Sequence, residues 1–267
     1  MSDVHPTSIV APGARLGAGV RIGPFCTIGP QVELGEACEL VSHVVVAGRT
    51  SIGARAKIYP FASLGQAPQD LKYRGEDSGL SVGDDCIIRE GVTINTGTAG
   101  GGMETRLGAR CVLLAYSHVG HDSTIGDDVI LSNNVMVAGH VRIGDFAVLS
   151  GGVGVHQFSR IGAHAFIGGL SGLEGDLIPF GLALGNRAQL AGLNLIGLRR
   201  RNFSRETIAA LQGAYRILFA DGGVMRDRVD LAAEKFGADA NVSEMIAFLR
   251  ASGDRPICRP PRAAADA

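Results

Sequence analysis

Two histidines, His118 and His121, stand three residues apart in the string SHVGHD, in a chain with only seven histidines. An acid, Asp122, follows His121 directly. Imidazole titrates near neutral pH, so such a pair can act as a general base toward a hydroxyl group or bind a metal ion. The pair can equally be an ordinary part of a repetitive surface. The elements that position these residues bear on the choice.

A six-residue repeat runs through most of the chain. Aliphatic residues recur at every sixth position from Val10 to Leu64, and a mostly small residue follows four positions after each. The same phase returns at Val82 and, after a break, runs from Leu107 to Ile167. A helix would need apolar spacings of three and four, and a half-buried strand would need longer alternation. The hexads instead predict a flat-sided coil with three hexads per turn, which is a parallel β-helix.

The composition fits a coil with a narrow interior. The chain has 39 glycines, no tryptophan and 5% aromatic residues. About eight turns of roughly 18 residues would make a prism about 38 Å tall at the usual strand spacing. The five cysteines show no CxxC pairing, and we interpret them as reduced core residues.

Charge and hydrophobicity exclude several classes of protein. The formal net charge of −1 argues against a general nucleic-acid binder. No basic leader with an apolar run and no apolar segment of about 18 residues is present, so we expect neither a signal peptide nor membrane insertion. We therefore expect a cytoplasmic protein.

The repeat is interrupted twice. Residues 66–81 (QAPQDLKYRGEDSGLS) form a polar excursion, and residues 100–106 (GGGMETR) form a glycine-rich one. Loops that leave a rigid solenoid often carry function. The first excursion places a carboxylate, Asp70, two residues from an ammonium group, Lys72, which favours a functional role. For the second, a tolerated insertion is an equally good interpretation.

The pattern changes near residue 190. We expect a coil over residues 1–189 and a helical domain over 190–267. Ser204 is the predicted N-cap of a first helix with Glu206 in its first turn. Two more helices are expected within 224–238 and 241–253, and the tail from residue 259 is expected to fray.

Positions 18 apart should lie above one another in such a coil. His121, Gly139 and Gln157 then share one column, and Asp122, His140 and Phe158 share the neighbouring column. His118 and His156 fall beside these columns, so four of the seven histidines converge on one patch. His164 falls on another face, where we interpret it as a solvated surface residue.

The histidine patch allows more than one chemistry. His121 could be a general base, with the Gly139 N–H directed at a developing oxyanion. Asp122 could orient that base only if the chain turns a corner between them, because adjacent strand residues point to opposite sides. Zinc-binding trimers of the gamma carbonic anhydrase type are the rival interpretation. A non-enzymatic scaffold should carry polar ladders, such as repeated threonines, and none is visible.

Several longer strings occur together in a characteristic order. They are QDLKY (69–73), SHVGHD (117–122), AGHV (138–141), VHQF (155–158), GGLSG (168–172) and GLNLIGLRRRNFS (192–204). In content and spacing they resemble the UDP-N-acetylglucosamine O-acyltransferases, hexapeptide-repeat enzymes that open lipid A synthesis. The resemblance covers almost the whole chain. It implies a left-handed coil, a hand that the hexads do not encode because chain chirality alone favours right-handed crossovers.

The resemblance also implies a reaction. A 3-hydroxyacyl group would pass from acyl carrier protein to the 3-hydroxyl of the UDP-sugar, without a covalent intermediate, a metal or another cofactor. His121 would be the general base, supported by Asp122, and the Gly139 amide would face the thioester oxygen. The enzyme would be a homotrimer with active sites between subunits.

Further roles follow from the same resemblance. The residues implied for the sugar and phosphate site are Asp70, Lys72, His118, His140, His156 and Gln157, and those implied for the nucleotide are Asn194, Arg200 and Arg201. Gly169 would set the accepted acyl length, and the absence of side chains at Gly168 and Gly169 favours a long donor. That these glycines only serve a tight corner of the coil is an equally good interpretation.

Two positions depart from the pattern of several family members, Ile196 for an acidic residue and Arg187 for histidine, which puts nearby nucleotide contacts in doubt. An acceptor sugar with a 3-amine in place of the 3-hydroxyl stays open. A related sugar-nucleotide N-acyltransferase, which acts two steps later, is a further alternative. It normally carries an extra N-terminal domain, for which a repeat beginning at Val10 leaves no room.

Overall fold

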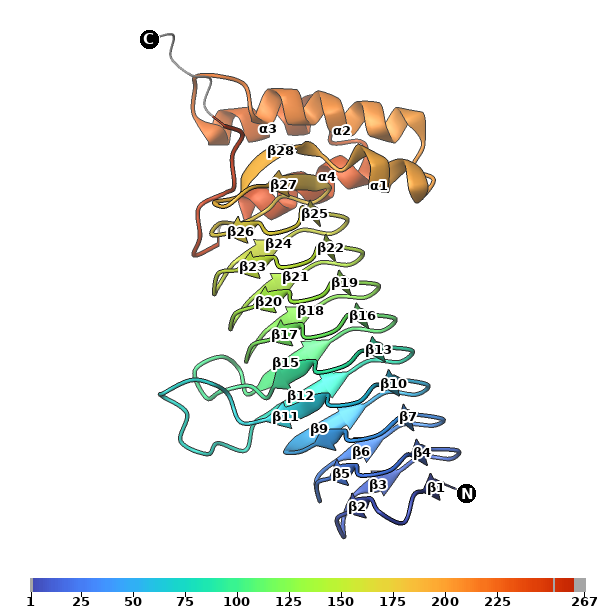
Figure 1. Ribbon diagram of the computed structural model, residues 1–267. Coiled ribbons are helices and arrows are strands. Elements are labelled where there is room, and N and C mark those ends of the chain that lie inside the picture. The colour runs from blue at the N-terminus through green and yellow to red at the C-terminus, as the bar shows by residue number, and fades with distance from the viewer. Residues whose placement is uncertain (1, 252, 262–267) are drawn as a thin grey trace.

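The computed structural model describes residues 2–251 and 253–261. Short strands form a tall coil with three faces, and helices pack on its C-terminal end (Figure 1). Each face is one sheet, and successive strands of the chain fall on different sheets in turn. The predicted architecture, a parallel β-helix followed by helices, is confirmed.

The three sheets are named A, B and C. Sheet A contains β1 (Asp3–Val4), β4 (Arg21–Ile22), β7 (Glu39–Leu40), β10 (Lys57–Ile58), β13 (Ile87–Ile88), β16 (Val112–Leu113), β19 (Ile130–Leu131), β22 (Val148–Leu149), β25 (Phe166–Ile167), β27 (Gly181–Leu184) and β28 (Gln189–Leu193). Sheet B contains β2 (Ile9–Val10), β5 (Thr27–Ile28), β8 (Val45–Val46), β11 (Ser63–Gln66), β14 (Thr93–Asn95), β17 (His118–Val119), β20 (Met136–Val137), β23 (Gly154–Val155) and β26 (Gly172–Leu173). Sheet C contains β3 (Arg15–Leu16), β6 (Glu33–Leu34), β9 (Arg49–Ile52), β12 (Gly79–Val82), β15 (Glu104–Leu107), β18 (Thr124–Ile125), β21 (Arg142–Ile143) and β24 (Arg160–Ile161).

Strand register follows the 18-residue period. His118 pairs with Met136, and Met136 pairs with Gly154, all in parallel. The hexad aliphatics from Ile22 to Ile167 are all buried and form one core along the axis. All five cysteines are buried and free, as their place in the repeat predicts.

The two excursions interrupt this period without breaking the sheets. Strands run to Gln66 and from Gly79, and again to Asn95 and from Glu104, so the excursions are residues 67–78 and 96–103. The boundaries predicted from the sequence, 66–81 and 100–106, differ from these. The reason is that β9, β12 and β15 are longer than the two-residue strands and pair along their whole length. Both loops project from the same side of the coil (Figure 1).

The C-terminal part contains α1 (Leu195–Arg200), α2 (Arg205–Leu218), α3 (Met225–Phe236) and α4 (Ala240–Arg250). Ser204 caps α2 by accepting a hydrogen bond from the Thr207 N–H, as predicted. The three expected helices are α2, α3 and α4, whereas α1 and the antiparallel hairpin of β27 and β28 were not predicted. Residues 262–267, where most of the expected fraying falls, lie outside the described residues.

Arg160 of the coil contacts both a buried carboxylate of the last turn and helix α4. The Nε of Arg160 donates to Asp176 Oδ2 at 2.7 Å, and its backbone N–H donates to Oδ1 at 2.8 Å. The same guanidinium stacks on Phe248 of α4, 4.4 Å from the ring centroid. The buried Asp176 carboxylate holds the guanidinium in place, and the stacking on Phe248 joins α4 to the last turn of the coil.

No helix in the described ranges has the length and apolar character needed to cross a bilayer.

His164 is not the solvated residue that the sequence suggested. Its ring stacks between Phe146, at 4.8 Å, and Phe180, at 5.5 Å, and meets the edge of Phe203 at 5.0 Å. The 18-residue period places Phe146 near it. Phe180 comes from the last turn, where paired residues are only 16 apart, and Phe203 comes from the link between α1 and α2. Burial disfavours the charged imidazolium, and the charge of Arg201 adds to this, so the pKa of His164 falls to about 4.

This low pKa predicts a loss of stability in mild acid. An unfolded histidine binds a proton below its ordinary value of 6.5, whereas folded His164 does so only near about 4, so the unfolding free energy should fall as pH drops through this window. At about pH 5 the loss should be of the order of 1–2 kcal/mol relative to neutral pH. His164→Phe keeps an aromatic ring without a titrating group. Denaturant titrations at both pH values should show a smaller acid loss in this variant, and an identical loss in both proteins would contradict the assignment.

Candidate active site

The histidine patch lies at the corner where the chain passes from sheet B to sheet C. Asp122 and His140 both adopt left-handed backbone conformations there, with φ of +59° and +60°. Such a residue turns the chain sharply, so neighbouring side chains need not point to opposite sides. The corner that contact between His121 and Asp122 requires is therefore present.

His121 and Asp122 form a hydrogen-bonded pair. The imidazole Nδ1 lies 2.8 Å from Asp122 Oδ2, and the carboxylate is completely buried. An ionised carboxylate can only accept, so the proton sits on Nδ1 and Nε2 is left as an acceptor. The His121 side chain is 16% exposed, so this free nitrogen belongs to a ring that a substrate can reach.

Gly139 lies directly against this ring. A Cβ at Gly139 would stand 2.6 Å from both Nε2 and Cε1 of His121, closer than real Cβ atoms approach other atoms. Only glycine therefore fits one turn above the base. Within residues 2–251 and 253–261, no group accepts a hydrogen bond from the Gly139 amide. A basic nitrogen and an available backbone donor thus belong to groups in direct contact.

Two further histidines flank the pair. The His140 ring stacks flat on Phe158 at 4.5 Å and meets His121 edge-on at 4.9 Å. The His118 Nδ1 lies 2.8 Å from Thr93 Oγ1. Burial lowers the pKa of both His118 and His140, although Asp122 partly opposes this for His140. Both rings are therefore neutral at neutral pH and offer hydrogen bonds rather than charge.

The first excursion reaches the same corner. The charges of Asp70 and Lys72 both act on His140, the first raising its pKa and the second lowering it. Asp70 Oδ1 accepts from the Lys72 N–H at 2.9 Å, which stabilises the turn that carries them. The loop over residues 67–78 thus brings a negatively charged carboxylate and a positively charged ammonium group to the histidine patch.

A groove of about 680 Å³ climbs sheet B beside this corner. Residues from five successive strands of the sheet line it, among them Thr93, His118, Met136, Gly154, His156 and Gly172. Most of this lining is apolar or small. His118 lies in the same strand column as Met136 and Gly154, and His156 follows β23 on the side of the histidine corner. The groove therefore suits a molecule that has an extended apolar part and a polar end.

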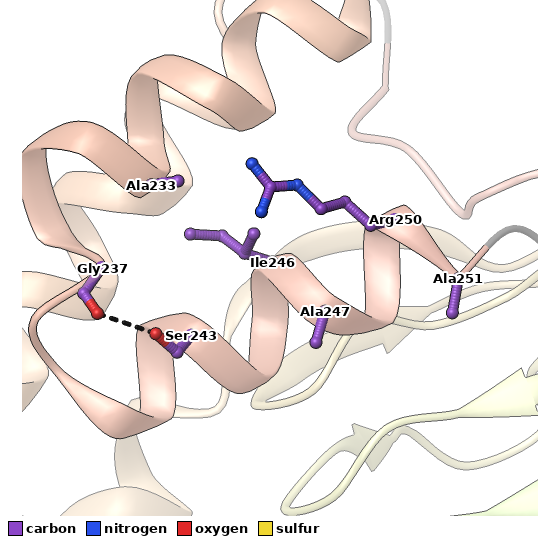
Figure 2. A pocket seen from close by; sticks show the side chains of 7 residues that line it. All are labelled: Ala233, Gly237, Ser243, Ile246, Ala247, Arg250 and Ala251. Carbon is purple, nitrogen blue, oxygen red and sulfur yellow. Dashed lines mark hydrogen bonds between the residues drawn. The ribbon is translucent and has the colours of Figure 1, made fainter.

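Another hollow lies between α3 and α4 (Figure 2). Its volume is about 620 Å³, and Arg250 is the one charged side chain among its seven lining residues. That guanidinium pairs with Asp230 at 2.7 Å, and the Ser243 hydroxyl donates to the Gly237 carbonyl. No reactive group gathers there, so the histidine corner is the candidate active site.

Ligand atoms of His121, Asp122 and His140 lie within 4.8 Å of one another, a spacing that a metal ion could use. Coordination would compete with existing hydrogen bonds, because Asp122 Oδ2 already accepts from His121 and from the Thr98 hydroxyl.

Comparison with known proteins decides the family. A sequence model described as UDP N-acetylglucosamine O-acyltransferase, domain 2, matches residues 176–258, and the bacterial transferase hexapeptide model matches 13–48 and 104–139. An acyl-[acyl-carrier-protein]–UDP-N-acetylglucosamine O-acyltransferase of Caulobacter vibrioides is 52% identical over 97% of this chain and 98% of its own length. The chain belongs to the UDP-N-acetylglucosamine O-acyltransferase family.

Further members of the family are similar to this chain in sequence and structure over nearly its whole length. The enzyme of the same name from Sinorhizobium fredii is 45% identical over 97% of this chain and 96% of its own. The solved UDP-N-acetylglucosamine O-acyltransferase of Moraxella catarrhalis is 38% identical, with a TM-score of 0.93 over 96% of this chain and 99% of that one.

The residues that family resemblance assigns to the nucleotide lie at another corner, between sheets C and A. Asn194 caps α1, accepting from the Gly197 N–H and donating to the His164 carbonyl, both at 3.0 Å. The Arg201 guanidinium stacks on Phe146 at 4.5 Å, and Arg200 beside it is exposed. One chain therefore does not bring these groups to His121.

The other family residues lie near the groove or at its rim. His156 lines the groove, and Gln157 is exposed and accepts from Arg255 through its carbonyl at 3.0 Å. Of the two departures from the family pattern, Ile196 is 64% exposed on α1. Arg187 pairs at 3.4 Å with Glu174, which lies at the upper end of the groove.

The sequence missed three residues that hold Asp122. Thr98 donates to both carboxylate oxygens, Thr105 Oγ1 accepts from the Asp122 N–H at 2.8 Å, and Gly101 packs against the carboxylate. Thr98 and Gly101 belong to the second excursion. The one signal for them in the sequence was the glycine run that breaks the hexads.

Proposed function

We propose that this chain transfers a 3-hydroxyacyl group from acyl carrier protein to the 3-hydroxyl of UDP-N-acetylglucosamine, the first step of lipid A synthesis. Relatives that are named for the transfer from acyl carrier protein to UDP-N-acetylglucosamine are similar to it over nearly the full chain. The observation that carries the mechanism is the His121 ring, whose Nδ1 is held by Asp122 and whose Nε2 lies against Gly139.

His121 acts as the general base. Its Nε2 takes the proton of the sugar hydroxyl as the oxygen attacks the thioester carbonyl, and the Gly139 N–H stabilises the negative charge that develops on the carbonyl oxygen. The buried Asp122 stabilises the imidazolium that forms. When the intermediate collapses, the carbon–sulfur bond breaks and the carrier thiolate takes the proton from His121. The enzyme thus forms no acyl intermediate and uses no cofactor or metal.

The surrounding polar groups bind the UDP-sugar. Asp70, Lys72, His118, His140, His156 and Gln157 line its sugar and phosphate part. The neutral state of His118 and His140 suits hydrogen bonding to sugar oxygens without a charge to desolvate. Arg200, Arg201 and Asn194 hold the nucleotide, where guanidinium groups match phosphate oxygens.

The active site lies between subunits of a homotrimer. His121 and Arg201 sit at different corners of one coil, so a single substrate meets both groups only if a neighbouring subunit supplies the second corner. The coil, residues 1–189, then contributes the base, and the helical domain, residues 190–267, contributes the nucleotide site of the next subunit.

The cellular partners follow from the reaction. Acyl carrier protein is the acyl donor, and the UDP-sugar is the acceptor. The five buried free thiols fit the reducing cytoplasm. The protein needs neither nucleic acid nor insertion into a membrane.

His121→Ala should leave the fold intact and lower kcat by about 10²–10⁴-fold or more, because the hydroxyl loses its base. Steady-state assays with UDP-N-acetylglucosamine and 3-hydroxyacyl thioesters of acyl carrier protein measure this. His5→Ala, at an exposed position in the first turn of the coil, is the matched control and should be fully active. Near-normal turnover of the His121 variant would refute the mechanism.

The same assays separate the alternatives. Stoichiometric zinc in the purified enzyme, with activity lost to a chelator, would favour a metal centre at His121, Asp122 and His140. Preference for a UDP-sugar with a 3-amine would instead identify an amine as the acceptor group.

Mixed trimers test the site between subunits. His121→Ala and Arg201→Ala subunits, refolded together in equal amounts, should regain intact sites at about a quarter of the interfaces, as random placement around a three-fold ring gives. Activity at low sugar-nucleotide concentration should then exceed that of either variant alone. If the mixture has only the average activity of its parents, both groups serve one subunit.

Gly169 should set the accepted acyl length. It lies at the edge of sheet B, three residues before Gly172 in the groove, and its backbone φ is outside the left-handed region. A Cβ there would meet only the Gly151 carbonyl oxygen, at 3.4 Å, so Gly169→Met should fold and shift preference toward shorter 3-hydroxyacyl donors than the long ones expected of the wild type. Competition between thioesters of different length measures the shift. Loss of activity with all donors alike, or an unchanged preference, would contradict the role.

A further inference from the structure

The second excursion, residues 96–103, lies directly beneath the catalytic corner. It leaves sheet B after β14 and enters sheet C with β15, the passage that residues 120–123 make one turn later. It therefore replaces the ordinary short corner below His121 and Asp122. Like the first excursion one turn below, it is longer than the ordinary corner between these sheets, and its three consecutive glycines, Gly100–Gly102, are found in no other corner of the coil.

The loop holds both oxygens of the Asp122 carboxylate. The Thr98 N–H donates to Oδ1 at 2.8 Å, and the Thr98 hydroxyl donates to Oδ2 at 2.6 Å. Oδ2 also accepts from His121, so the three donors fix the position and rotation of the carboxylate. Thr98 is itself 6% exposed, and its carbonyl accepts from the N–H groups of Gly101 and Met103 at 3.1 and 3.0 Å. The loop thus closes on itself around the residue that holds the acid.

Gly101 covers the carboxylate. A Cβ at this position would stand 2.0 Å from Asp122 Cγ and 2.3–2.4 Å from its two oxygens. The loop backbone thus occupies the space through which water would otherwise reach the carboxylate. A buried carboxylate depends on protein donors for its hydrogen bonds, and Thr98 supplies two of them.

We infer that Thr98 is a positioning residue for the transfer reaction, and that the loop over residues 96–103 is a clamp that orients His121 through Asp122. This inference rests on the proposed function, because it assumes that His121 is the base. Thr98 does not touch the substrate. It acts by fixing the carboxylate to which the imidazole Nδ1–H is bound, so that Nε2 points at the substrate hydroxyl.

The clamp also affects how strongly the negative charge of Asp122 acts on the His121 ring. Each donor on the carboxylate withdraws some of its negative charge from the imidazole. Without the Thr98 hydroxyl, the carboxylate stabilises the imidazolium more strongly, and the base form appears only at higher pH. The acid limb of the pH profile of kcat should therefore move upward, whereas a merely structural loop would leave it in place.

Thr98→Val and Thr98→Ser form the first matched pair. Valine has the shape of threonine without the hydroxyl, and its backbone N–H still reaches Oδ1. The valine variant should lose about 10- to 100-fold in kcat, the usual effect of one hydrogen bond to a charged group. Its KM for both substrates should be unchanged, and its acid limb should shift upward. The serine variant should regain kcat and the original pH profile.

Gly101→Ala and Gly100→Ala form the second pair, in the same loop. An added Cβ at Gly101 meets the carboxylate, whereas one at Gly100 meets nothing within 4 Å, and neither glycine has a left-handed φ. Gly101→Ala should lower kcat and leave KM unchanged, and Gly100→Ala should behave as wild type. Equal activity of the two alanine variants would overturn the assigned role of Gly101 as a cover.

A spectroscopic readout separates this inference from the proposed function. The Nδ1–H proton of His121, bound to a carboxylate, should give a downfield NMR signal that is absent in His121→Ala and exchanges faster with water in Thr98→Val. An unchanged signal, kcat and pH profile in Thr98→Val would overturn the clamp even if His121→Ala is inactive. If His121→Ala is active, the proposed mechanism fails, whereas the change in proton exchange still reports whether Thr98 holds the pair.

Discussion

The parallel backbone ladder is the constraint on which the rest of the structure depends. From β1 to β26 each strand pairs with a strand one turn away, and outside the excursions these paired residues are 18 apart, as in His118 and Met136. A position in the sequence therefore fixes a height along the coil and one of three faces. The ladder leaves a narrow interior that aliphatic side chains such as Ile125 and Ile143 fill completely. Polar groups that do chemistry are left to the corners and loops.

The corners carry a conformational cost that the ladder offsets. Asp122, His140 and Phe158 all have φ near +60°, a region in which residues other than glycine cost about 1–2 kcal/mol. Strands above and below fix each corner, so these conformations persist without glycine. Because the turn falls between His121 and Asp122, two adjacent residues face one another, which a straight strand would not allow. The backbone strain and the contact between His121 and Asp122 thus have the same origin.

The sequence predicted what is periodic and missed what is not. The hexads located the strands and the core, and the 18-residue spacing placed Gly139 over His121 and Phe158 beside His140. The path of the second excursion could not be derived, because a glycine run permits many loop conformations, and the contact of Thr98 with Asp122 depends on one of them. The prediction that His164 is a solvated surface residue was wrong for a similar reason, since Phe203 contacts its ring from outside the repeat. The antiparallel pair β27 and β28 also follows the end of the hexads.

The groove on sheet B is built from one short strand per turn. Its outward-facing positions, Met136, Gly154 and Gly172, belong to successive turns that stand about 4.8 Å apart. A change of side chain at one of these positions alters the groove at a single level and leaves the levels above and below as they are. The depth of the groove is thus divided into independent steps, each set by one residue. Variation at these positions can tune what the groove admits while the histidine corner, on the adjoining edge of the coil, keeps its geometry.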